Sequence, residues 1–236
     1  MADFLLVHGS CHGAWCWRDL IPALTARGHT ARAIDLPGHG QDTTPYADVT
    51  LEGYANAILA AIDTPVMLLG HSMAGFPISL AAEMAPDKVE RLIYLCAYAA
   101  QDGRSLAEMR AEAPQQPMAD AAIRTDDGLA FHVDPAKAPA LFYNDCPTEA
   151  VDDALPRLCL QAMAPQTTPI RLGAAYASVK RSYIRCDDDR TIPPEYQRTM
   201  TADWPEADVY AMPTGHSPFF ADPAGLADLL TRIAKG

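Results

Sequence analysis

Short runs of apolar residues alternate along the chain with longer stretches in which apolar residues recur every three or four positions. The short runs are brief and several are continuously apolar, which is typical of parallel strands covered on both faces. They predict six strands: Phe4–Val7, Ala31–Ile34, Val66–Leu69, Leu92–Leu95, Ser182–Cys186 and Asp208–Met212. The longer stretches predict helices over Trp15–Ala26, Leu51–Ile62, Met73–Met84 and Ala224–Ile233. This alternation predicts an α/β protein with a mostly parallel, doubly wound sheet of about six strands.

The alternation stops after Leu95 and resumes only near Lys180. The intervening segment is rich in proline and contains short helical patterns, of which Thr148–Ala162 is the clearest. A structureless loop of this length is improbable in a compact protein. We therefore expect a helical lid over residues 97–179, inserted into a core formed by residues 1–96 and 180–236.

Composition narrows the range of partners. The 236-residue chain is 49% hydrophobic and carries a net charge of −12. Such an acidic balance argues against a nucleic-acid surface, which needs clustered Lys and Arg, and weakly against an anionic membrane surface. The first residues resemble no signal peptide, and no apolar stretch approaches a membrane span. The six cysteines show no metal-binding or paired spacing, so we expect reduced thiols and a cytoplasmic protein.

The strongest chemical signal is a serine placed between a predicted strand and a predicted helix. Val66–Leu69 runs into Gly70-His71-Ser72-Met73-Ala74-Gly75. A nucleophile elbow needs this context, because a sharp turn lifts the serine hydroxyl above the sheet. The usual G-x-S-x-G pattern is altered, since Ala74 replaces the second glycine and Gly75 follows one position later. Alanine is also small, so we expect the turn to form, with Ser72 as the nucleophile.

Serine needs a base and an orienting carboxylate. In proteins that carry the serine on such an elbow, the order along the chain is serine, acid, histidine. Only His132 and His216 follow Ser72, and His132 falls in the predicted lid. His216 directly follows the last predicted strand, which favours it as the base. The strand ending at Cys186 leads into three consecutive aspartates. Consecutive residues point in different directions, so one of them is the acid: Asp189 is the first choice and Asp187 the alternative.

The loop after the first strand supplies a second part of the site. An oxyanion needs two backbone N–H donors, one from the residue after the nucleophile and one from an early loop. Met73 and Ser10 occupy these positions. His8 and His12 have the spacing of a helical metal pair, but this stretch contains glycine and predicts a turn. We therefore expect no metal site, and a structural hydrogen-bonding role for His8.

These segments closely resemble the plant methylesterase and hydroxynitrile lyase family of α/β-hydrolases, which includes methyl salicylate esterases. The resemblance runs through Phe4–Trp17, Gly70–Gly75, Ser178–Cys186, Ile192–Gln197 and Gly215-His216, and is poor in the lid. It places Ser72, Asp189 and His216 on the family's triad and Ser10 and Met73 on its oxyanion hole. Asp35–Gly40 departs from the plant pattern and resembles the commoner bacterial version, which indicates a bacterial member of the family.

Three positions separate the two chemistries of this family. By the resemblance, its lyases carry Thr, Glu and Lys where this chain has Gly9, His71 and Ser217. A lysine would stabilise departing cyanide, which Ser217 cannot do. The chain is therefore interpreted as a serine carboxylesterase that requires no cofactor. The alternatives are a hydroxynitrile lyase and a small-molecule receptor that makes little use of the triad.

The substrate is the least determined part of this interpretation. Apolar residues of the lid suggest a hydrophobic acyl or aryl pocket and thus small methyl or aryl esters. The candidate binding residues are His71, Phe131, Leu141, Phe142, Leu158 and Met163. The partner we expect is a small-molecule ester. Relatives in the resembled family are commonly dimeric, which leaves a homodimer as an open expectation.

Overall fold

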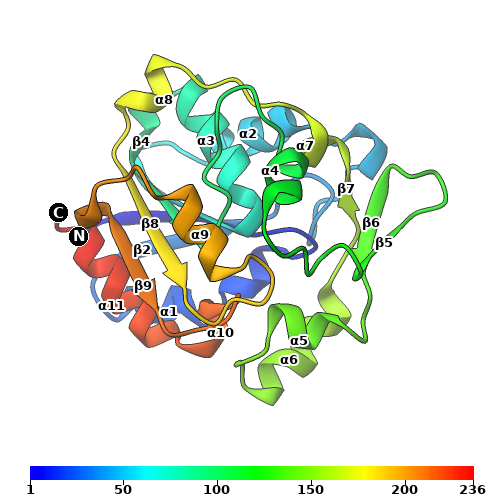
Figure 1. Ribbon diagram of the computed structural model, residues 1–236. Coiled ribbons are helices and arrows are strands. Elements are labelled where there is room, and N and C mark those ends of the chain that lie inside the picture. The colour runs from blue at the N-terminus through cyan, green and yellow to red at the C-terminus, as the bar shows by residue number, and fades with distance from the viewer.

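A six-stranded parallel sheet forms the centre of the molecule in the computed structural model, which describes residues 1–236 (Figure 1). Its strands follow the order β2-β1-β3-β4-β8-β9, and every neighbouring pair is parallel. Each predicted strand is present: β1 Asp3–Val7, β2 Thr30–Ile34, β3 Val66–His71, β4 Val89–Leu95, β8 Arg181–Cys186 and β9 Val209–Met212. The predicted doubly wound architecture is thereby confirmed.

The two faces of the sheet carry separate hydrophobic cores. Alternate residues of a strand point to opposite faces, so Phe4 and Leu6 enter one core while Leu5 and Val7 enter the other. Helices α1 (Leu20–Thr25) and α11 (Pro223–Ile233) cover the first face. Helices α2 (Leu51–Ala60), α3 (Gly75–Met84), α8 (Ala174–Ser178) and α9 (Pro194–Met200) cover the second. Burial on both faces explains why the strands are continuously apolar.

Local chemistry fixes where several helices begin and end. The Thr50 side chain accepts a hydrogen bond from the Gly53 N–H at the start of α2, and Asp222 does the same for Gly225 in α11. The single helix predicted over Trp15–Ala26 is instead a 3₁₀ turn, Ala14–Trp17, followed by α1. The helix predicted from Met73 is also preceded by a 3₁₀ turn, Ser72–Ala74, and α3 begins at Gly75.

The segment after β4 is not helical throughout. It contains α4 Leu106–Glu112, α5 Ala138–Phe142, α6 Thr148–Ala154 and α7 Ala164–Thr167, but also a three-stranded antiparallel sheet of β5 Ala122–Arg124, β6 Ala130–Val133 and β7 Gln161–Ala162. The helix predicted over Thr148–Ala162 ends at Ala154, because Pro156 cannot continue it. Figure 1 shows β5, β6, α5 and α6 on the side of the molecule opposite the two termini. The lid boundaries at 97 and 179 stay a prediction.

All six cysteines are free, and four of them are buried. No helix has the length and apolar character needed to cross a membrane.

Candidate active site

Ser72 lies at the sharp turn between β3 and α3. Its φ of 57° is in the left-handed region, which a non-glycine residue adopts only when its surroundings enforce it. A Cβ on Gly70 would lie 2.9 Å from the Ala74 carbonyl oxygen, and one on Gly75 would lie 2.1 Å from the Tyr98 carbonyl oxygen. The turn thus needs glycine at 70 and 75, whereas Ala74 is accommodated in full burial. This accounts for the displaced second glycine of the motif.

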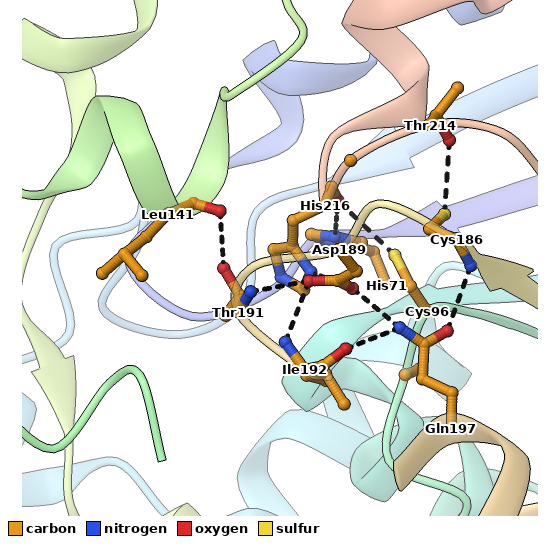
Figure 2. Close-up of polar contacts among 12 residues, drawn as sticks. His71, Cys96, Leu141, Cys186, Asp189, Thr191, Ile192, Gln197, Thr214 and His216 are labelled. Atoms are coloured by element: carbon orange, nitrogen blue, oxygen red, sulfur yellow. Dashed lines mark hydrogen bonds and ion pairs between the residues drawn. The ribbon is translucent and has the colours of Figure 1, made fainter. Parts of the chain in front are cut away.

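His216 and Asp189 meet in a buried region formed by the loops that follow β8 and β9. The His216 Nδ1–H donates to Asp189 Oδ2 at 2.8 Å, and both side chains are almost completely buried (Figure 2). The second oxygen, Asp189 Oδ1, accepts from the N–H groups of Thr191 and Ile192 at 2.7 and 2.9 Å. Gln197 Nε2 donates to Oδ2 at 2.9 Å. The carboxylate therefore has four donors, and a neutral imidazole that donates through Nδ1 offers Nε2 as its proton acceptor.

The other two aspartates of the run face elsewhere. Asp187 is partly exposed and its Oδ1 lies 3.3 Å from Arg198 Nη2. Asp188 accepts from Asn144 Nδ2 at 2.8 Å, at the surface. Only Asp189 contacts His216, because the turn after β8 directs each successive side chain differently.

The Ser10 loop lies against the same turn. His12 Nδ1–H donates to the Ser10 carbonyl at 2.7 Å, while the Ser10 N–H has no acceptor within the protein. The Ser10 hydroxyl accepts from Gln166 Nε2 at 3.0 Å. These bonds fix the loop and leave one backbone donor for an oxyanion.

His8 holds this loop to its neighbour. Its Nδ1–H donates to the Gly9 carbonyl, and its Nε2 accepts from the Leu36 N–H at 3.1 Å. Both ring nitrogens are engaged, as are those of His12, whose Nε2 lies 2.8 Å from the Tyr143 hydroxyl. Neither histidine is arranged to share a metal ion, in keeping with the turn expected there.

Two further buried groups lie beside His216. His71 Nε2–H donates to the His216 carbonyl at 2.8 Å, and the Cys96 thiol donates to the same oxygen at 3.4 Å. Burial lowers the pKa of His71 and raises that of Cys96 well away from their usual values, so both stay neutral. These three residues are close enough together to hold a metal ion, but His71 Nε2 and His216 Nδ1 are already engaged by the His216 carbonyl and by Asp189. Their arrangement fits the support of His216 better than metal binding.

Ser72 and His216 line one small cavity, here called the inner cavity, of about 30 Å³. Ser10 and Met73, predicted as oxyanion donors, line it as well, and so do His71, Phe131 and Phe142 from the candidate binding residues. Met163 lies instead at a neighbouring cavity. Leu141 and Leu158 reach neither; Leu141 contributes its carbonyl to a hydrogen bond from Thr191.

Four further residues of the site were not predicted from the sequence: Gln197, Gln166, Tyr98 and Arg110. Gln197 is fully buried, donates also to the Ile192 carbonyl at 2.8 Å and accepts from the Cys186 N–H at 3.1 Å (Figure 2). It joins β8 to the loop that carries Asp189. A glutamine on the apolar stripe of α9, beside Tyr196 and Met200, was the available signal. The others come from the lid or follow β4 and carry no local pattern.

Comparison with known proteins finds similarity over nearly the whole chain. Residues 4–229 match the model of the alpha/beta hydrolase family. Methylesterase 1 of Arabidopsis thaliana is 32% identical, over 98% of this chain and 95% of that protein. A pyrethroid hydrolase from Sphingobium faniae JZ-2 superimposes with a TM-score of 0.89 at 29% identity, over 100% of this chain and 98% of that one. Polyneuridine aldehyde esterase gives 0.88 at 25% identity, over 99% of both chains.

Proposed function

The chain belongs to the alpha/beta hydrolase family, and from that premise we propose that Ser72, His216 and Asp189 act as a catalytic triad for ester hydrolysis. The resemblance to plant methylesterases noted in the sequence is confirmed over nearly the whole chain. Its relatives are carboxylic ester hydrolases, and this protein is one also, acting on small-molecule esters. The observation that carries the assignment of roles is the buried 2.8 Å contact of His216 with Asp189 above the strained Ser72 turn.

Acylation begins when the Ser72 hydroxyl oxygen attacks the ester carbonyl carbon. His216 Nε2 takes the hydroxyl proton, and Asp189 stabilises the resulting imidazolium through Nδ1–H. The carbonyl oxygen becomes an oxyanion that accepts from the Ser10 and Met73 N–H groups, each worth roughly 3 kcal/mol in comparable sites. The intermediate collapses by breaking the bond to the alkoxy oxygen, which receives the proton from His216 and leaves as the alcohol.

Deacylation repeats these steps with water. His216 removes a proton from the attacking water, the oxyanion forms in the same place, and Ser72 leaves with that proton as the carboxylic acid is released. Phe131 and Phe142 beside the reacting atoms support esters with apolar methyl or aryl parts.

Gly9 supports hydrolysis over cyanohydrin cleavage. A Cβ at this position would lie 2.8 Å from His71 Nδ1 and 2.9 Å from Ser72 Cβ, so the threonine of the lyases has no room here.

Ser72→Ala tests the proposal. It removes the nucleophile without adding bulk, so hydrolysis of 4-nitrophenyl acetate should fall by at least about 10³-fold, to the level that the oxyanion donors support alone. Ser79→Ala is the matched control, because Ser79 is buried in α3 and bonds the Gly75 carbonyl and the Tyr94 hydroxyl away from the cavity. Equal activity of Ser72→Ala and the wild type would disprove the role of Ser72.

A further inference from the structure

The walls of the active-site cavities carry positive charge in a strongly acidic protein. The chain has 30 acidic and 18 basic residues. Arg110 is the only lining residue of the inner cavity with a permanent charge. An adjoining outer cavity of about 180 Å³ shares Arg110, Met118 and Phe131 with it and adds Arg124. No carboxylate lines either cavity.

Arg110 has no ion-pair partner. Its Nη1 donates to Gln166 Oε1 at 3.2 Å, and no carboxylate lies within ion-pair distance of its guanidinium. Arg104, just before α4, is by contrast paired with Glu112 at the end of the same helix. A basic residue in the last turn of a helix commonly interacts favourably with the negative end of the helix dipole. The side chain of Arg110 instead donates its hydrogen bond to Gln166 and not to the carbonyls of α4. Its remaining donors are available to an anion.

A short hydrogen-bond chain connects Arg110 to the reaction centre. Gln166 is almost fully buried; its Oε1 accepts from Arg110 and its Nε2 donates to the Ser10 hydroxyl at 3.0 Å. Ser10 also provides the candidate oxyanion donor. An anionic group held by Arg110 would therefore lie only a few atoms from the scissile carbonyl.

The sizes of the two cavities also favour a substrate that extends from Ser72 past Arg110. The inner cavity, about 30 Å³, has room for about two water molecules. An ester carbonyl placed at Ser72 leaves little space there for the rest of the substrate. The larger outer cavity lies beyond Arg110 and carries the second arginine, Arg124. A substrate that extends outwards from Ser72 thus passes one unpaired guanidinium and approaches another.

We propose that Arg110, assisted by Arg124, selects esters that carry a second, free carboxylate, such as half-esters of short dicarboxylic acids. This inference rests on the proposed esterase function and names its substrate class. Arginine binds carboxylates through two parallel hydrogen bonds, which gives it orientation as well as affinity. The apolar lining then accommodates the carbon chain between the two carboxyl groups, while Arg110 fixes which end faces Ser72.

The test compares matched esters that differ in one charge. Mono-4-nitrophenyl glutarate places the carboxylate on the acid part, and 4-nitrophenyl hexanoate is its neutral counterpart. 3-Carboxyphenyl butyrate and phenyl butyrate form the pair with the carboxylate on the alcohol part. The quantity measured is the ratio of kcat/KM for the charged ester to that for the neutral ester, which cancels losses common to both. The pair with the larger ratio tells which part of the substrate faces Arg110.

Arg110→Gln should lower this ratio by about 10- to 100-fold, the range for a hydrogen bond to a charged group, and Arg110→Lys should lower it less. Arg232→Gln, an exposed arginine of α11 outside both cavities, is the charge-matched control and should leave the ratio unchanged. A change of less than about threefold in Arg110→Gln for both pairs, or the same fall in Arg232→Gln, would overturn the inference. If the wild type hydrolyses neither of the two neutral esters faster than Ser72→Ala does, the esterase function itself is overturned.

Discussion

Replacing Asp189 by asparagine tests the triad at the point that the sequence left open. Asp189 Oδ1 accepts from two backbone N–H groups, so the asparagine oxygen should keep that position. Its NH₂ group would then occupy the place of Oδ2 and face His216 Nδ1 and Gln197 Nε2. It would donate to His216, move the ring proton to Nε2 and leave no acceptor for the Ser72 proton.

The loss of activity in Asp189→Asn can be estimated from the distance between His216 and Asp189. Two unit charges 2.8 Å apart interact by about 6 kcal/mol at an effective dielectric constant of about 20. Asparagine keeps the shape of the side chain but not its charge, so we expect a loss of about 4–6 kcal/mol of transition-state stabilisation. That corresponds to a fall in kcat of roughly 10³- to 10⁴-fold.

The assay is steady-state hydrolysis of 4-nitrophenyl acetate near pH 8, with circular dichroism to verify folding. Asp187→Asn is the matched control. Its carboxylate is partly exposed and faces Arg198 and Arg185, so kcat should change by less than about twofold. The reasoning is refuted if Asp189→Asn stays within about tenfold of the wild type while folded, or if Asp187→Asn loses as much.

Two predictions concern stability. Gly75→Ala would place its Cβ 2.1 Å from the Tyr98 carbonyl oxygen and should lower the free energy of unfolding, measured in urea, by about 2–4 kcal/mol. The control Ala74→Gly should lower it by about 1 kcal/mol or less. Equal effects of the two substitutions would contradict the account of the turn. Burial lowers the pKa of His12 from 6.5 to about 4, so the unfolded chain binds the extra proton between these values and stability falls as the pH is lowered through this window. This change in the free energy of unfolding amounts to about 3 kcal/mol. His12→Gln should remove it from the pH dependence of unfolding in urea, while the exposed control His132→Gln should leave it in place. An unchanged slope of unfolding free energy against pH in His12→Gln would refute the assignment.

Much of the core could be predicted because its signals are local. A parallel strand covered on both faces must be apolar throughout, and this is visible without knowing its neighbours. The Ser72 turn was equally visible, since strand, small residues and helix follow one another within a few positions. Helix ends were less accurate: the turn at Ala14–Trp17 and the stop at Pro156 depend on packing and on single residues within an otherwise helical pattern.

The lid is where local patterns gave least. Its antiparallel sheet pairs Phe131 with Gln161, far along the chain, a separation that no short window spans. Of the six candidate pocket residues, His71, Phe131 and Phe142 lie at the inner cavity and Met163 at the outer one, while Leu141 and Leu158 lie at neither. Apolar side chains serve equally well to pack the lid or to line a pocket, so composition cannot separate the two uses.

The sequence by itself determined the six strands of the core, the sharp turn that carries Ser72 and the histidine that follows the last strand. Folding alone decided which aspartate of three consecutive ones turns inward, because adjacent side chains differ in direction and not in chemistry. It also decided that Gln197 holds that carboxylate and that Arg110 from α4 faces the same cavity as Ser72. Arg110 and Ser72 lie far apart along the chain and reach the same cavity only in the folded molecule.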